Sequence, residues 1–388
     1  MQHQPRPIDR PFWTPGVLVL LGFMIAGAVA LLARFIGGLG YATNLSNATP
    51  WGIWIGLDVG SGVALAAGGF TTAALAHIFG RRAYEAVTRP ALLTAALGYS
   101  FVAFAILVDI GRSWAIWKPM IFHNYNSALF EVAMCVMTYL TVLWIEMVPI
   151  LAERFGQRVP LLAWLDKRLS AFMWVFIILG VVLSCMHQSS LGTLMVIAQT
   201  KMHVLWNTPF LPLLFLLSAF AVGYPMVIVE TNLATTSLRL DNEMDVLGPL
   251  SRFTIVTLGA YLLVRLWDVL YRGALGAAFD GSAAANSFLA EVGLGVILPW
   301  ILLLFPTVRG SRRGLFFSAL LIVGGVVLNR VNVFIVAYTP HTATSPYFPA
   351  MAEILVTAGA VATIMFLYRV FVTWTPVLSA PKQEEVAS

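Results

Sequence analysis

Long apolar runs cover this chain almost from end to end. About 20 consecutive apolar residues let a helix cross the ~30 Å hydrocarbon layer of a membrane. Lipid offers the backbone no hydrogen-bond partner, so each run is expected to form a helix. The mean hydropathy of +0.85 is too high for a soluble fold and predicts an all-α integral membrane protein. Ten runs are predicted to span the membrane: 16–36, 51–79, 90–110, 127–151, 170–187, 209–237, 251–272, 286–307, 314–338 and 349–372.

The net charge of +5 is explained by membrane topology rather than by a nucleic-acid partner. Basic residues gather in alternate connections, which face the cytoplasm under the positive-inside rule. This predicts a multi-pass protein of the bacterial cytoplasmic (inner) membrane with both termini inside. The first run is interpreted as a retained helix rather than a signal peptide, because it continues through Phe35. The basic residues that set the orientation are Arg6, Arg10, Arg81, Arg82, Arg89, Arg154, Arg158, Lys167, Arg168, Arg309, Arg312 and Arg313.

The few ionisable residues of the apolar runs lie toward one membrane face. A charge in hydrocarbon costs roughly 2.5–3.5 kcal/mol on insertion scales, so such residues are usually paired, hydrated or functional. The predicted topology assigns this face to the outside. The residues concerned are Asp58, Asp109, Arg112, Glu131, His187, Arg265, Asp268, Glu291, Arg330 and Glu353.

A weak internal repeat relates the two halves. A shift of 160 residues aligns the segment 126–131 with 286–291 and Arg112 with Arg272. The interval covers four runs, which predicts two parallel four-helix bundles at 51–190 and 209–338, flanked by helices 16–36 and 349–372. The alternatives are chance similarity and ordinary helix capping, in which Asn or Ser caps a helix and Glu suits its first turn.

Haem and metal chemistry have little support in the sequence. A bis-histidine haem needs two imidazoles at matched depth, but His77 lies near the inner end of its run and His187 near the outer end of another. Cys135 and Cys185 form no ligand pair, so no iron–sulfur cluster is predicted in this protein. The remaining histidines fall in the tail or the outer connections: His3, His123, His203 and His341.

The outer polar residues of the first bundle are compatible with a quinone site. Asp58 lies ~10 Å into its run at 1.5 Å per residue, and Glu131 lies about one turn into another. Such groups can bind the two carbonyl oxygens of a quinone and move protons, a role that suits His187 because its ordinary pKa is near neutrality. The alternatives are structural: a dipole-complementing role for Glu131 and a hydrogen-bonding role for His187.

Two arginine–carboxylate pairs are expected from helical spacing. Asp109 and Arg112 are three residues apart, as are Arg265 and Asp268, so each pair shares a helical face. The second is predicted to be structural, whereas the first is either structural or part of the quinone site.

Three acidic or imidazole groups, His77, Glu146 and Glu230, lie toward the inner side. They define a candidate proton path. The alternative is that Glu146 and Glu230 simply approach the cytoplasmic surface.

Several motifs in order resemble the NrfD/PsrC family of quinone-interacting membrane subunits, and within it the HybB-like type. The resemblance covers about residues 15–375. It rests on Pro50-Trp51-Gly52-Ile53-Trp54-Ile55 with Asp58, Arg89-Pro90-Ala91-Leu92-Leu93, Asp109-Ile110-Gly111-Arg112, Asn126-Ser127 through Glu131, and Met186-His187-Gln188-Ser189-Ser190-Leu191-Gly192.

The resemblance implies a haem-free helical protein with a menaquinone or ubiquinone pocket. It also implies a periplasmic ferredoxin-like iron–sulfur subunit, together with a hydrogenase, a multihaem cytochrome c or a molybdopterin-type subunit. Some members are labelled b-type cytochromes, which the histidine positions here do not support. Carried over by motif, the pocket residues are Trp51, Asp58, Asp109, Arg112, Glu131, His187 and Gln188, with Asp58, Glu131 or His187 handling the proton.

The predicted function is therefore that of a membrane subunit, not catalytic alone, that exchanges electrons between iron–sulfur partners and membrane quinone, with proton translocation as an open extension. The alternative is a secondary transporter or ion translocator, which parallel repeats and buried carboxylates would also suit.

Overall fold

The computed structural model describes residues 4–240, 243–343 and 346–380. Within these ranges it contains ten helices that are long and apolar enough to cross a membrane. The prediction of an all-α membrane protein with ten spans is confirmed. His3 lies outside the described residues.

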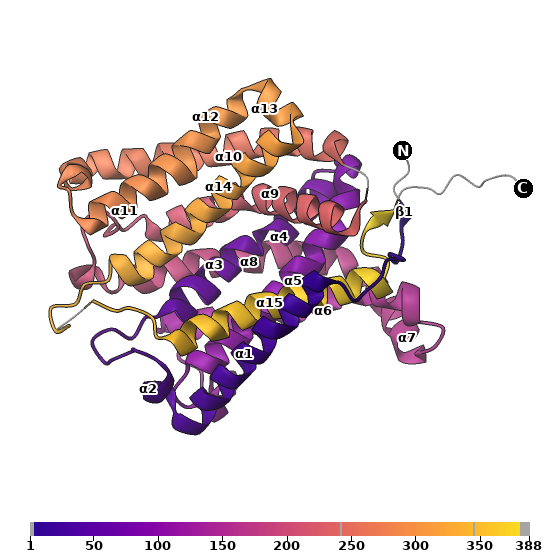
Figure 1. Ribbon diagram of the computed structural model, residues 1–388, viewed down its shortest axis with the longest axis horizontal. Helices are drawn as coiled ribbons and strands as arrows, with labels where there is room; N and C mark the ends of the chain where they lie inside the picture. Colours follow the sequence, from indigo (N-terminus) through magenta and orange to yellow (C-terminus); the bar gives the residue numbers. More distant parts are fainter. Residues whose placement is uncertain (1–3, 241–242, 344–345, 381–388) are drawn as a thin grey trace, which may run out of the picture.

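The ten spans follow one another along the sequence, and several of them join two or more helical segments (Figure 1). They are α1 (Pro15–Gly37); η1 (Trp54–Val59), α3 (Gly60–Leu65), α4 (Ala67–Ala73) and η2 (Ala74–Ile78); η3 (Arg82–Tyr84) and α5 (Glu85–Asp109); α6 (Ala128–Phe155); α7 (Pro160–Leu169), η6 (Ser170–Phe172) and α8 (Met173–Val196); α9 (Leu211–Leu238); α10 (Met244–Tyr271); α11 (Ala283–Val292), η9 (Gly293–Ile297) and α12 (Leu298–Leu304); α14 (Arg312–Val331) and η10 (Asn332–Val336); and α15 (Met351–Trp374).

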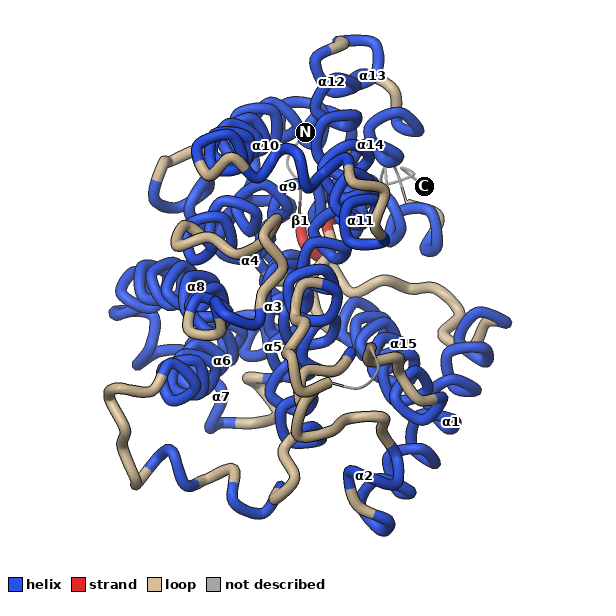
Figure 2. Tube along the Cα trace, turned by 90° about the vertical axis from the view of Figure 1, so that its left-hand side faces the viewer, coloured by secondary structure: helices blue, strands red, loops and turns tan. Residues whose placement is uncertain are grey.

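Short elements connect these spans. They are α2 (Leu39–Ala42), η4 (Ser113–Ala115), η5 (Lys118–Met120), η7 (Gln199–Lys201), η8 (Ala274–Phe279) and α13 (Pro306–Gly310). In Figure 2, which looks onto the left-hand side of Figure 1, many of the longer loops between helices face the viewer.

Several helices extend beyond the predicted apolar runs. The third span begins at Arg82 and the seventh at Met244, although prolines lie close to both starts, at Pro90 and Pro249. Each proline lies past the first turn and removes one intrahelical hydrogen bond, and membrane helices tolerate such a proline where neighbouring groups satisfy the freed carbonyl. The fifth span continues to Val196. Hydropathy marks only the part of a helix that lies in lipid, which explains these differences.

The helices pack as one continuous body. The second span contacts α5 and α8, and α6 contacts α5 and α8, while α9 contacts α10 and α14. However, α9 also packs on α4 and α8, so close packing joins the two halves of the sequence. The division into two four-helix bundles stays a prediction.

The flanking helices α1 and α15 lie side by side along most of their length (Figure 1). Gly27 and Gly359 face each other where the two helices cross. A Cβ atom added at Gly27 would lie 2.8 Å from the Cα of Gly359. Small residues are needed wherever membrane helices approach this closely.

The two ends of the described sequence meet in a small antiparallel pair. Strand β1 (Gln4–Pro5) pairs with β2 (Ser379–Ala380), with Gln4 opposite Ala380. An even number of membrane crossings requires both ends on one side, and this pairing agrees with that requirement.

Candidate functional site

A cavity of about 710 Å³, here called the central cavity, lies among the second span, α5, α9, α1 and α15. Apolar side chains form most of its walls. Pockets of this size and character suit ligands with a large apolar body. Helices α1 and α15 form two of its walls, although the sequence placed them outside the bundles.

Asp58 lies at one end of the central cavity, which is called the outer end here because the predicted topology assigns it to the outside. It belongs to η1, a π-helical turn, and such turns often occur at functional sites because they re-aim side chains. The Thr357 hydroxyl of α15 donates a hydrogen bond of 2.8 Å to Asp58 Oδ2. Nearby on the same wall, the buried Ser61 Oγ has no hydrogen-bond partner among the described residues. This end of the cavity therefore has polar groups with capacity left for a ligand oxygen.

Arg34 of α1 fixes the outer end of α5. Its Nε donates to the carbonyl oxygen of Val108 at 2.6 Å, and its Nη2 donates to that of Ile110 at 2.7 Å. A cation at a helix C-terminus is stabilising because the last carbonyls carry negative charge. Asp109, the last residue of α5, lies within electrostatic range of Arg34 and Asp58. One of its oxygens is buried without a hydrogen-bond partner among the described residues.

Glu353 fixes the start of α15, and both of its carboxylate oxygens accept hydrogen bonds from the protein. Its Oε2 accepts from the backbone N–H groups of Ala350 at 2.8 Å and Asn44 at 3.1 Å. Its Oε1 accepts a hydrogen bond of 2.5 Å from the Tyr347 hydroxyl in the preceding loop. Burial raises the pKa of Tyr347, and the bond to Glu353 adds to that shift. Glu353 therefore positions the cavity wall rather than facing a ligand.

Three predicted pocket residues lie elsewhere. The Trp51 ring packs against that of Phe334, with centroids 6.0 Å apart. Arg112 is exposed in the loop after α5 and, within the described residues, does not form the expected ion pair with Asp109. Glu131 is exposed and accepts a hydrogen bond from Ser190 Oγ at 2.5 Å. None of the three is among the described residues that line the central cavity.

His187 and Gln188 are fully buried on α8, outside the cavity walls described above. His187 Nδ1 shares a hydrogen bond of 3.1 Å with the Tyr99 hydroxyl, and Gln188 Nε2 donates to the carbonyl oxygen of Val63 at 2.8 Å. His187 Nε2 and Gln188 Oε1 have no partner among the described residues. The structure thus separates these two residues from Asp58 by placing them on another face of the second span.

The inner-side residues fall in three different places. Glu230 lines the inner half of the central cavity together with Thr94 and Tyr368. Glu146 lies against α8, where a Cβ at Gly180 would meet its carboxyl group. His77 is exposed at the inner end of the second span. Only Glu230, of these three predicted residues, shares a cavity with Asp58.

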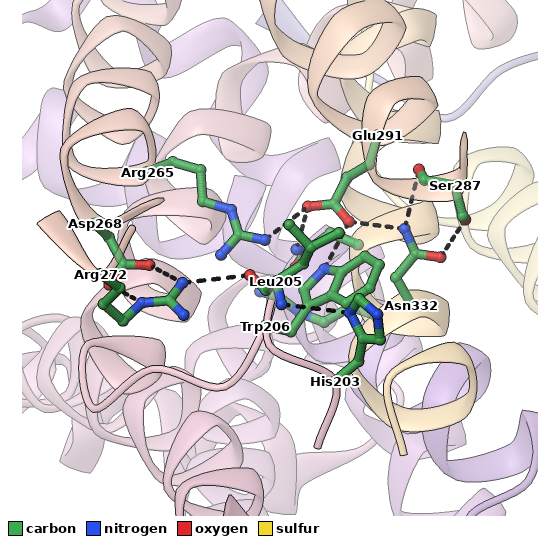
Figure 3. Close-up of polar contacts among 11 residues, drawn as sticks. His203, Leu205, Trp206, Arg265, Asp268, Arg272, Ser287, Glu291 and Asn332 are labelled. Carbon is green, nitrogen blue, oxygen red and sulfur yellow. Dashed lines mark hydrogen bonds and ion pairs between the residues drawn. The ribbon is translucent and has the colours of Figure 1, made fainter. Parts of the chain in front are cut away.

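A second buried polar cluster lies among α10, α11 and α14 and the loop before α9 (Figure 3). Arg272 pairs with Asp268 through its Nε at 3.0 Å and its Nη2 at 2.8 Å, and Thr208 donates to Asp268 at 2.5 Å. Arg272 also donates to three backbone carbonyls of that loop, those of Val204, Leu205 and Asn207. The fork of one guanidinium thus joins α10 to the outer connection between the fifth and sixth spans.

Glu291 is the centre of the same cluster (Figure 3). Its two oxygens accept hydrogen bonds from Trp206 at 3.0 Å, Asn329 at 2.7 Å and Asn332 at 2.8 Å. Arg265 Nη2 lies 3.7 Å from Glu291 Oε1. A buried carboxylate with this many donors is satisfied, so the geometry favours a structural role.

The expected pair between Arg265 and Asp268 is not the one that forms. Asp268 pairs with Arg272, four residues on, and Arg265 pairs with Glu291 of the neighbouring helix. Spacings of three and four both bring side chains together. The bidentate geometry available to Arg272 decides between them.

The described histidines lie in different parts of the molecule. His77 and His187 lie toward opposite ends of their spans, and His123, His203 and His341 lie in connections. Within the described residues there is also no group of three or more histidine, cysteine or acidic side chains arranged for a metal ion.

Several residues around the central cavity were missed by the sequence analysis. Thr357 and Ser61 carry no signal, because each is an ordinary residue of an apolar helix. Arg34 did carry one, since it is a basic residue near the end of the first apolar run. Its burial, at 4 % exposure, indicates a fixed role.

Ten spanning helices, five of which enclose an apolar cavity with a carboxylic acid at one end, define a multi-pass membrane protein. The protein belongs to the family described as polysulphide reductase, NrfD, whose model matches residues 42–341. This confirms the family predicted from the motifs.

Three relatives show the range of this family. The sequence is 34% identical to the probable Ni/Fe-hydrogenase 2 b-type cytochrome subunit of Escherichia coli, over 99% of this protein and 98% of the relative. It is 26% identical to the menaquinone reductase integral membrane subunit of Nitratidesulfovibrio vulgaris, over 92% and 90%. It is 23% identical to a selenate reductase subunit of Mesobacillus selenatarsenatis, over 95% of each. These relatives favour a subunit of a redox complex over a transporter.

Proposed function

We propose that this protein exchanges electrons between an extracytoplasmic iron–sulfur partner subunit and quinone dissolved in the membrane. The observation that carries the proposal is the central cavity, an apolar space with Asp58 and Thr357 at its outer end. The name of the Nitratidesulfovibrio vulgaris relative, a menaquinone reductase subunit, supports menaquinone as the ligand, with ubiquinone as the alternative.

The chemistry follows from the groups at that end. Reduction of a quinone to a quinol takes up two electrons and two protons. The electrons come from the iron–sulfur clusters of the partner subunit, and oxidation runs the same path in reverse. The Thr357 hydroxyl orients Asp58, and the Asp58 carboxyl donates a proton to a quinone oxygen or receives it from the quinol. Asp109, close by, is the next group available to exchange that proton.

The site is thus proposed at Asp58 rather than at Glu131 or His187. Asp58 lines the cavity, whereas Glu131 is exposed and His187 is enclosed against Tyr99. Trp51, Arg112 and Gln188 take no direct part in this proposal.

The test uses the purified complex and a menaquinone. Asp58→Asn keeps the shape and removes the proton, so electron transfer should fall about 100-fold, the low end for loss of a general acid or base. Thr357→Val should lower it less, because it removes only the orienting hydrogen bond. Thr373→Val on the same helix is the matched control, since the Thr373 hydroxyl bonds only to its own helix. Unchanged electron transfer in Asp58→Asn would contradict the site.

Proton translocation is a second proposal that one observation favours. Glu230 lines the inner half of the cavity that Asp58 closes at the outer end. A carboxyl group there can pass protons between the quinone site and the inner side of the membrane. His77 and Glu146 do not line this cavity, so the proposed proton path does not require them. Protons moved per electron in vesicles should fall in Glu230→Gln, and an unchanged ratio would reject the path.

The partner and the membrane complete the proposal. We propose the cytoplasmic membrane of a bacterium, both termini inside, and a hydrogenase, multihaem cytochrome c or molybdopterin-type enzyme upstream of the ferredoxin-like subunit. We also propose that the protein holds no haem, because its described histidines lie at unmatched depths, despite the b-type cytochrome name of the Escherichia coli relative. A haem absorption spectrum of the purified protein tests this.

A further inference from the structure

The fifth span is longer than a membrane crossing needs. It runs from Pro160 to Val196, 37 residues in all. Its main helix, α8, has 24 residues, which is ~36 Å at 1.5 Å per residue and already exceeds the ~30 Å hydrocarbon layer. Helix α7, joined to the start of α8 by η6, therefore lies beyond the hydrocarbon. Figure 1 shows it at the end of the molecule where β1 lies, so it belongs to the membrane face that carries both ends of the described sequence.

Two faces of α7 have different surroundings. Leu162, Leu165 and Leu169 follow helical spacing and are half-buried, and α7 contacts α6. Another face carries Leu161 and Trp164, which are 61% and 54% exposed. Large exposed apolar side chains are typical of amphipathic helices that lie in the headgroup region of a membrane. Tryptophan is also enriched at that depth.

Exposed basic residues accompany this apolar face. Arg154 lies in the last turn of α6 and Arg158 in the turn that follows it, while Lys167 and Arg168 lie in the last turn of α7. The Arg168 guanidinium lies over the Trp164 ring, 5.8 Å from the ring centroid. This cation–π contact holds positive charge beside apolar surface.

The neighbouring acidic residues do not balance this positive charge. Glu153 already forms an ion pair of 2.9 Å with Arg89. Asp166 is half-buried and shares the packed face of α7 with Leu162 and Leu169. Among the described residues, the four basic side chains form no ion pair with a carboxylate. A ligand for this surface must therefore combine negative charge with apolar area.

We propose that the exposed side of α7 binds anionic phospholipids through their headgroups. The α7 surface, as it is called here, consists of Arg154, Arg158, Leu161, Trp164, Lys167 and Arg168. An anionic phospholipid meets both requirements, because its phosphate attracts the basic side chains and its acyl chains cover the apolar ones. An acidic protein would match only the charge. This inference is independent of the proposed quinone site.

The test places one fluorophore on α7 and offers it two lipids. In a Cys135→Ala, Cys185→Ala background, Ala163→Cys carries a bimane label, and the protein is reconstituted in phosphatidylcholine vesicles. A nitroxide close to the headgroup is supplied on phosphatidylglycerol or on phosphatidylcholine at the same mole fraction. The anionic lipid should quench at least about fivefold more effectively, the enrichment that one basic residue near an anionic surface provides (~1 kcal/mol).

Two charge-matched variants locate the effect. Arg158→Gln/Lys167→Gln/Arg168→Gln should make the two lipids quench equally. The control, Arg10→Gln/Arg82→Gln/Arg313→Gln, removes the same charge from exposed positions on the same predicted face and should keep the preference. Salt gives a second measurement that needs no change of charge. Raising it from about 0.1 to about 1 M shortens the Debye length from ~10 to ~3 Å, so the preference should shrink.

Every other result counts against the inference. Equal quenching by the two lipids before any arginine or lysine is replaced overturns it, because α7 would then contact lipid without regard to charge. Quenching by neither lipid also overturns it, since α7 would face water or a protein partner instead. A preference that survives the triple substitution on α7, or that is insensitive to salt, overturns the assignment to these basic residues.

Discussion

Two aspartates in spanning helices illustrate how surroundings decide what a residue does. Asp268 accepts hydrogen bonds from Thr208 and from two nitrogens of Arg272, so its charge is paired and its bonding capacity is largely used. Asp58 accepts a hydrogen bond from Thr357 and faces an apolar space. A carboxyl group with capacity left can exchange a proton with a ligand, whereas a saturated one holds helices together. The sequence analysis placed both aspartates among the ionisable residues of the apolar runs, because sequence alone does not show which hydrogen bonds each one makes.

The Arg272 fork gives a prediction about stability. Arg272→Lys keeps the positive charge but loses the planar fork that bonds to Asp268 and to the loop carbonyls at once. The free energy of unfolding should fall by about 1.5–3 kcal/mol, the range for hydrogen bonds to charged groups, and this loss should appear as a lower melting temperature in detergent. Arg313→Lys, at an exposed arginine, is the control and should leave the melting temperature unchanged. Equal melting temperatures for both variants and the parent would show that the cluster contributes little.

At the scale of the helices, the number and type of elements could be predicted from the sequence, but the way they assemble could not. Apolar runs require ten helices, because lipid leaves the backbone no other choice. The π-helical turn η1, which carries Asp58, has no signature in local sequence. Nor does the packing of α15 against the second span, since it depends on contacts some 300 residues apart, such as Asp58 with Thr357. Helices α1 and α15 were therefore predicted as flanks, and the structure makes them walls of the central cavity.

The crossing of α1 and α15 can be tested with two glycines on one helix. Gly27→Leu places a side chain where the Gly359 backbone already lies, 2.8 Å from a Cβ, so the two helices must separate. Overpacking of this kind costs about 1–3 kcal/mol. Gly22→Leu, on the same helix with open space around it, should be tolerated. The melting temperature in detergent should fall only for Gly27→Leu, and a similar result for both would contradict the close crossing.

For the whole molecule, the pattern of basic loops and the pairing of β1 with β2 both put the two ends on one side. The positive-inside rule predicts that this side is the cytoplasm. Local sequence patterns could not show which of the candidate residues line a cavity, because a cavity is a property of the assembled helices. Glu131, His187 and Asp58 all lie at one membrane face, but only Asp58 turns into the cavity.

Cysteine labelling tests this orientation. In a Cys135→Ala, Cys185→Ala background, a single cysteine at Ser46 or Tyr125 should react with a membrane-impermeant maleimide added to intact cells. A cysteine at Arg82 or Arg158 should react only after the cells are opened. Labelling in the opposite sense would invert the topology and move the proposed quinone site to the cytoplasmic side.

The walls of the central cavity include the second span and α15, which lie far apart in the sequence, and this separation has a consequence for biosynthesis. Spans enter the membrane in the order in which the ribosome makes them, so Asp58 is inserted long before Thr357 and the rest of α15. Until then one side of the proposed quinone site is open to lipid. In a nascent polypeptide the proposed site is therefore complete only after α15 has been inserted.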